Sequence, residues 1–182
     1  MVSPLRQPPI VAQTFSRIGV LLAALLVLGL SPLGFISVAG VGKAITLLHI
    51  PVILAATLEG PFAAALLGAV FGVIAGIKYP IPGVAIGFHV MARLLSGLAA
   101  ALAFQALSSS SRRDSRITIA STGAVVAGTV ANTLIMSLLV LLLTGASPEE
   151  LLSVAVLHGI VELMMATVIV VPLTIALVGG RP

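Results

Sequence analysis

Six apolar segments, separated by short polar or glycine- and proline-rich intervals, make up most of this chain. They span residues 15–36, 45–59, 61–77, 86–107, 117–143 and 150–178. A helix needs about 20 residues to cross the hydrocarbon core of a bilayer, and the first, fourth, fifth and sixth segments are long enough. Only Glu59-Gly60-Pro61 separates the shorter second and third segments, so we expect these two to form a tight helical hairpin. The pattern predicts an all-α membrane protein, a bundle of six transmembrane helices.

The N-terminal segment, residues 1–13, is rich in proline and precedes the first apolar run. We expect it to be a cytosolic stub, followed by a single six-helix transmembrane domain over residues 14–182. A signal peptide within residues 1–40 is the alternative. The apolar stretch is long for a signal peptide, and Ser31-Pro32 is more typical of a helix end than of a cleavage site. We therefore expect the first helix to be retained.

The composition agrees with a membrane protein. Hydrophobic residues make up 59% of the chain and charged residues only 8%, and the mean hydropathy is +1.28. A soluble domain carries roughly 25% charged residues. The chain has no cysteine, which excludes disulfides and cysteine metal ligands. It also has no Trp, one Tyr and no basic stripe, so we expect no binding to nucleic acid.

Basic residues flank the predicted helices unevenly. With six spans, the 108–116 loop lies on the same side of the membrane as both termini. That side holds Arg6, Arg17, Arg112, Arg113, Arg116 and Arg181, whereas the opposite side holds Lys43 and Lys78. Cytoplasmic loops are enriched in Lys and Arg. We therefore expect both termini in the cytosol and the loop around Lys43 on the outer face.

The segment Gly40-Val41-Gly42-Lys43 has the outline of a nucleotide-binding P-loop. The complete motif is Gly-x-x-x-x-Gly-Lys-Ser/Thr after a strand. Here Ser37 replaces the first glycine and Ala44 replaces the hydroxyl residue that binds magnesium. The predicted topology also places the segment on the outer face, where there is no ATP. We expect that the chain itself does not hydrolyse nucleotide and is not an enzyme.

Ionisable and amide side chains within the apolar segments are costly in a membrane and usually functional. They are His49, His89, Arg93, Asn132, His158 and Glu162. The predicted topology places all of them in the outer half of the bilayer. His89 and Arg93 are four residues apart and share a helix face, as do His158 and Glu162. The pattern predicts a polar binding cup that opens outwards above an apolar floor, with Lys43 in a loop above it.

Each of these residues also has a structural interpretation. Arg93 can extend towards the headgroups, and Glu162 can be a partner of Arg93 or His158. His49 precedes Ile50-Pro51 and can cap a helix, while Asn132 can join two helices by hydrogen bonds. The functional interpretation rests on the shared location of the whole set.

Small residues recur every four positions on two of the predicted helices. The third carries Ala64, Gly68, Gly72 and Gly76, and the first carries Gly19 and Ala23. Such a face allows another helix to approach closely. The partner helix can belong to the same bundle or to another membrane subunit, and the spacing alone leaves both interpretations open.

The stretch from Ile36 to Gly76 resembles the substrate-binding S components of energy-coupling factor (ECF) vitamin transporters. The resemblance rests on Thr46 to Val52, which reads TLLHIPV, then on Gly60-Pro61 and on the small-residue helix that follows. Weaker similarities lie at Arg93 to Gly97, Asn132-Thr133 and Gly159 to Glu162. They extend the likeness over residues 15–178.

The resemblance implies six helices with cytosolic termini, in the plasma membrane of a prokaryote. It also implies a vitamin site near the outer surface. As partners it implies a coupling transmembrane protein, docked on the small-residue faces, and two cytosolic ATPase subunits. No cofactor is implied. The basic residues around the cup favour a small anionic vitamin, and the TLLHIPV segment is most similar to the pantothenate branch.

Two other classes compete with this interpretation. In an intramembrane enzyme, His158 and Glu162 would bind a metal ion together with His89 or His49. The chain has no His-Glu-x-x-His sequence and no paired aspartates to support that chemistry. A structural or assembly subunit would explain the small-residue faces but not the outer polar cluster.

Overall fold

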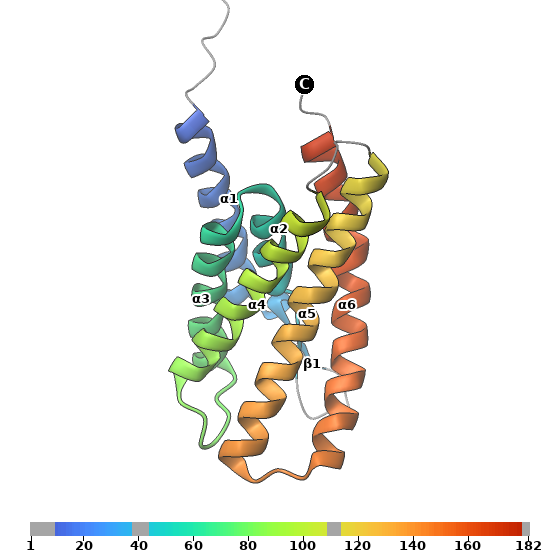
Figure 1. Ribbon diagram of the computed structural model, residues 1–182. Coiled ribbons are helices and arrows are strands. Elements are labelled where there is room, and N and C mark those ends of the chain that lie inside the picture. Colours follow the sequence, from blue (N-terminus) through green and yellow to red (C-terminus); the bar gives the residue numbers. More distant parts are fainter. Residues whose placement is uncertain (1–9, 38–43, 109–113, 180–182) are drawn as a thin grey trace, which may run out of the picture.

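The computed structural model describes residues 10–37, 44–108 and 114–179, and Figure 1 shows these as one elongated helical bundle. The helices are α1 (Ile10–Leu30), α2 (His49–Leu58), α3 (Pro61–Lys78), α4 (Ile86–Ser108), α5 (Asp114–Thr144) and α6 (Pro148–Gly179). The start of α1 and the end of α6 lie at the same end of the bundle (Figure 1). The predicted all-α fold with six helices is confirmed.

The second helix differs from the others in length and in surroundings. In the described part of the chain, five helices are long and apolar enough to cross a membrane, whereas α2 has only 10 residues. Nine of these residues are buried, and α2 contacts each of the other five helices. Because protein surrounds it, α2 does not have to match the bilayer thickness.

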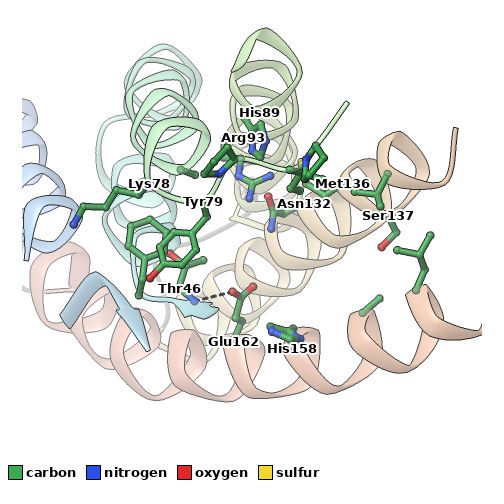
Figure 2. Close-up of a pocket in the computed structure, with 18 residues that line it drawn as sticks. Thr46, Lys78, Tyr79, His89, Arg93, Asn132, Met136, Ser137, His158 and Glu162 are labelled. Atoms are coloured by element: carbon green, nitrogen blue, oxygen red, sulfur yellow. Dashed lines mark hydrogen bonds between the residues drawn. The ribbon is translucent and has the colours of Figure 1, made fainter. Parts of the chain in front are cut away.

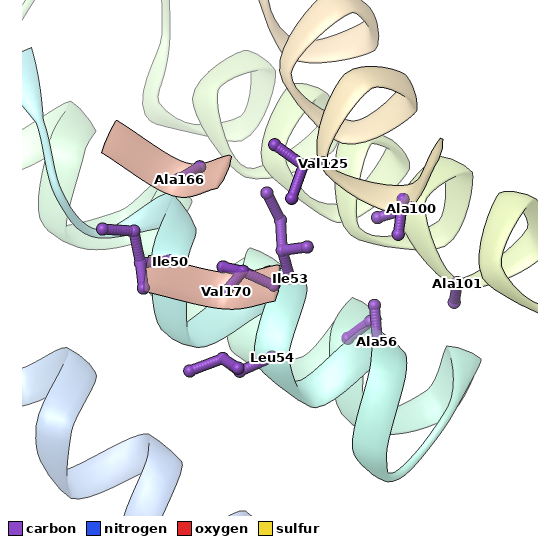
Figure 3. Close-up of a cluster of buried hydrophobic side chains, with 11 residues drawn as sticks. Ile50, Ile53, Leu54, Ala56, Ala100, Ala101, Val125, Ala166 and Val170 are labelled. Atoms are coloured by element: carbon purple, nitrogen blue, oxygen red, sulfur yellow. The ribbon is translucent and has the colours of Figure 1, made fainter. Parts of the chain in front are cut away.

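The core is built around α2. Ile50, Ile53 and Leu54 pack in one cluster with Val125 of α5 and Val170 of α6 (Figure 3). The turn into α3 is tight and begins at Gly60, whose φ of +91° is a conformation that favours glycine. The predicted helical hairpin around Glu59-Gly60-Pro61 is therefore present, with its first arm inside the bundle.

A short β-hairpin stands where the sequence suggested helix. The apolar runs 15–36 and 45–59 predict helix at both flanks, but α1 ends at Leu30 because Pro32 disfavours helical geometry at Ser31. After a single 3₁₀ turn (η1, Pro32–Gly34), β1 (Phe35–Ser37) pairs antiparallel with β2 (Ala44–Thr46). Phe35 lies opposite Thr46. The whole glycine-rich segment, Gly40 to Lys43, lies outside the described residues.

Helices α3 and α4 approach each other through the small residues of α3. A Cβ atom at Gly68 would lie 2.9 Å from the carbonyl carbon of Arg93, and one at Gly72 would lie 2.7 Å from the carbonyl oxygen of His89. Ala64 is fully buried and Gly76 faces Ile86. In this structure α4 therefore occupies the small-residue face of α3, which favours its interpretation as packing within the bundle.

The corresponding face of α1 is open. Gly19 and Ala23 are exposed, and a Cβ atom at Gly19 would have no neighbour within 4 Å among the residues that the structure describes. Of the two small-residue faces noted in the sequence, the face on α1 is the one that remains available to another membrane protein.

Candidate binding site

A cavity of ≈ 460 Å³ lies between α3, α4, α5 and α6, at the end of the bundle formed by the α3–α4 and α5–α6 connections. Its wall combines apolar residues with a set of polar ones. The polar residues are Thr46, Lys78, Tyr79, His89, Arg93, Asn132, Ser137, His158 and Glu162 (Figure 2). A cavity of this size is large enough for a vitamin-sized molecule.

Five of the site residues proposed from the sequence line this single cavity. They are His89, Arg93, Asn132, His158 and Glu162, which come from three different helices. His49 is not among the lining residues and lies buried behind the wall. The helix spacing and the topology were thus sufficient to place these polar groups together.

Arg93 is positioned by α3. The close contact at Gly68 and Gly72 brings Phe71 beside the arginine, and the guanidinium carbon lies 5.1 Å from the centre of the Phe71 ring. A cation over an aromatic face is stabilised by the ring quadrupole. Among the described residues, Nε and Nη1 of Arg93 have no hydrogen-bond partner, although both are shielded from solvent. The arginine is therefore held in place with unused donors.

His89 and Asn132 add further unused groups near Arg93 (Figure 2). His89 is 2% exposed, and neither of its ring nitrogens has a partner in the described part of the chain. The side-chain oxygen of Asn132 is likewise buried without a partner there. A neutral histidine offers one donor and one acceptor, and an amide oxygen accepts. Buried polar groups are normally hydrogen-bonded, so this wall is suited to a polar ligand.

Glu162 connects α6 to the β-hairpin and α2. Its Oε1 accepts a hydrogen bond from the backbone N–H of Thr46 at 3.0 Å. Its backbone oxygen lies 3.2 Å from Nε2 of His49, a hydrogen bond in the tautomer that protonates Nε2. His49 thus holds the start of α2 against α6 instead of contacting the cavity. A carboxylate has about four acceptor sites, so Glu162 keeps capacity for a ligand.

An aromatic and basic group forms another part of the wall. The rings of Phe35 and Tyr79 lie 4.6 Å apart, and Nζ of Lys78 lies 5.9 Å from the centre of the Phe35 ring. Sequence reasoning noted Lys78 as a loop charge but did not select Phe35, Thr46, Tyr79 or Ser137. Ser137 lies five residues after Asn132 on α5, and this spacing alone did not single it out. Phe35 and Thr46 depend on the unforeseen hairpin.

The arrangement gives no support to a metal-dependent enzyme. In residues 10–37, 44–108 and 114–179, no group of three His, Asp or Glu side chains is placed to hold a metal ion. His49 is separated from the cavity by its contact with α6.

The protein is a helical membrane bundle with a polar cavity at one end, an arrangement suited to binding a small molecule. The family model described as "ECF transporter, substrate-specific component" matches residues 13–174. The chain belongs to this family. Comparison with curated proteins gives no significant match.

Membership in the family defines the general role of the protein. It is the substrate-specific membrane component of an ECF transporter and acts together with an ECF module. Such components are binding proteins for transport and not enzymes. The protein is a multi-pass protein of the prokaryotic plasma membrane.

Proposed function

We propose that this S component binds a small anionic vitamin in the cavity lined by Arg93, and that pantothenate is the first candidate. One observation carries the proposal: Arg93 lines a cavity of ≈ 460 Å³, and two of its buried nitrogens, Nε and Nη1, have no hydrogen-bond partner among the described residues. Buried donors that lack an acceptor are unfavourable, and a carboxylate that accepts two hydrogen bonds from a guanidinium compensates this cost. The pairing of arginine with a carboxylate supports an anionic ligand and not a particular vitamin skeleton.

The ligand enters from the outer face in this proposal. The cavity lies at the end of the bundle opposite the start of α1 and the end of α6 (Figure 1), and the distribution of arginines predicts that the termini are cytosolic. Lys78 is exposed at the cavity. It would attract an anion to the opening, and we expect the same of Lys43, which lies outside the described residues.

The partners in this proposal are a coupling transmembrane protein and two cytosolic ATPase subunits. The exposed face of α1 around Gly19 and Ala23 is the surface on which we expect the coupling protein to bind. Its small side chains allow a close approach of helices within the bilayer, and no other described helix covers Gly19.

Pantothenate binding to the purified protein tests the proposed function. We expect saturable binding by calorimetry, and we expect Arg93→Leu to weaken it roughly 10- to 100-fold, because hydrogen bonds to a charged group are worth about 1.5–3 kcal/mol. Arg116→Leu is the matched control, since Arg116 lies at the opposite end of α5 from the cavity. If the binding of every anionic vitamin is unaffected by Arg93→Leu, the proposed function is wrong.

A further inference from the structure

The cavity contains more than a site for an acid group. Arg93 on α4 and Glu162 on α6 lie on different walls (Figure 2). Each is fixed by a separate contact, Arg93 by the Phe71 ring and Glu162 by the Thr46 N–H. Two opposite charges are thus held in one cavity, and Nε and Nη1 of the arginine are not used by the carboxylate.

The hydrogen-bond acceptors in the cavity set a second requirement for the ligand. The Asn132 side-chain oxygen has no donor among the described residues, and the Glu162 carboxylate has acceptor sites beyond the one that Thr46 uses. An acid without donors would satisfy Arg93. It would also leave the Asn132 oxygen unpaired and place its own negative charge in the same cavity as Glu162. Sites with buried polar groups discriminate strongly against ligands that leave these groups unpaired.

We propose that the ligand is an acid that also carries hydroxyl, amide N–H or amine donors. The acid group contacts Arg93, and the donors contact the Asn132 oxygen and the Glu162 carboxylate. This inference rests on the proposed function and narrows the substrate class. It includes hydroxy acids, amide- or urea-containing acids and amino acids, and it excludes acids whose remaining part is apolar or purely accepting.

Matched probes separate the two requirements. Pantothenate and biotin are acids with O–H or N–H donors, lipoate and nicotinate are acids without such donors, and panthenol is the neutral counterpart of pantothenate. The assay is the melting temperature of the purified protein in detergent as each probe is titrated. We expect pantothenate or biotin to raise the melting temperature at a concentration at least 10-fold lower than lipoate, nicotinate or panthenol requires for the same rise. This difference corresponds to the penalty for an unpaired buried group.

Two variants test the acceptors directly. Glu162→Gln keeps a carbonyl oxygen for the Thr46 N–H but removes the charge, and Asn132→Leu removes the acceptor while keeping the same number and branching of side-chain heavy atoms. Each is expected to weaken binding of the donor-bearing acid roughly 10-fold or more. Glu149→Gln is the control, because Glu149 is exposed and outside the cavity. If Asn132→Leu does not fold, Glu162→Gln carries the test alone.

The outcomes distinguish this inference from the proposed function. If lipoate or nicotinate binds as tightly as the donor-bearing acids, the protein binds an anion but the inference is wrong. If panthenol matches pantothenate, the requirement for an acid is wrong and both proposals fail. If no probe raises the melting temperature, mass spectrometry of small molecules extracted from the purified protein identifies any bound ligand and decides between the outcomes. A retained acid with donors supports the inference, a retained molecule without them overturns it, and no retained molecule overturns the proposed function.

Discussion

The contact between α3 and α4 yields the sharpest test of how the fold positions the site. At Gly72 an added Cβ atom would lie 2.7 Å from both the carbonyl oxygen of His89 and the amide nitrogen of Val90. These neighbours are backbone atoms and cannot rotate away. The helices would have to separate by about 0.7 Å to bring these two atoms to an ordinary contact of 3.4 Å, and by more to relieve the closer contact with the Cα atom of Val90. Such a shift moves His89 and Arg93 away from Phe71.

We therefore expect Gly72→Ala to destabilise the protein and to weaken ligand binding. Overpacking in a close-packed interior costs about 1–3 kcal/mol, whereas the higher helix propensity of alanine contributes up to about 1 kcal/mol in the opposite direction. For a chain of this size each kcal/mol changes the melting temperature by roughly 2–4 °C. A decrease of up to about 12 °C is the expected result by thermal melting in detergent, with lower pantothenate affinity by calorimetry.

Gly87→Ala is the matched control for this variant. Gly87 lies in α4, is exposed, and has no atom within 4 Å of the position of an added Cβ. It receives the same gain in helix propensity without the clash, so its melting temperature should stay the same or rise. Equal melting temperatures and affinities for the two variants would refute the conclusion that the α3 glycines set the position of Arg93.

Two further substitutions probe contacts that the structure identifies. Phe71→Leu removes the ring beside Arg93. It should raise the pantothenate dissociation constant measured by calorimetry roughly 2- to 30-fold, because the cation–π contact contributes about 0.5–2 kcal/mol. The control Phe62→Leu, at a residue 77% exposed on the same helix, should leave the dissociation constant unchanged. Thr57→Val removes the 3.0 Å hydrogen bond between the buried hydroxyls of Thr57 and Thr174 and should lower the free energy of unfolding by about 1–3 kcal/mol. Adding Thr174→Val should restore part of the lost stability in thermal melts. A loss of stability in the double variant that exceeds the sum of the losses in the two single variants would contradict this account.

The helices could be predicted from the sequence because the bilayer constrains them. Length and hydropathy locate a membrane helix to within a few residues, as the agreement between the run 86–107 and α4 (Ile86–Ser108) shows. The same rule does not reveal that α2 is a buried central helix. Hydropathy is equally high for a segment that faces lipid and for one that faces other helices, so His49–Leu58 differs from the others only in length.

The site was predictable to the extent that it depends on helix depth and face. His89 and Arg93 follow from their spacing of four residues, and the topology aligns them with Asn132 and Glu162 at one end of the bundle. The contacts between segments were not predictable in this way. The bond from the Thr46 N–H to Glu162 joins residues 116 positions apart, and it exists because Pro32 ends α1 early and leaves room for a hairpin.

The small residues show the limit of a spacing argument most clearly. Gly19 and Ala23 of α1 have the same spacing as Gly68 and Gly72 of α3, yet one pair faces outwards and the other contacts the backbone of α4. The difference arises from neighbours rather than from the residues themselves. α4 follows α3 through a short connection and packs along it, whereas only a minor part of α1 is buried within the bundle. The small-residue face of α3 is packed against α4 of the same chain and sets the position of a binding residue. The small-residue face of α1 is left open on a weakly packed helix and is the surface that another membrane subunit can use.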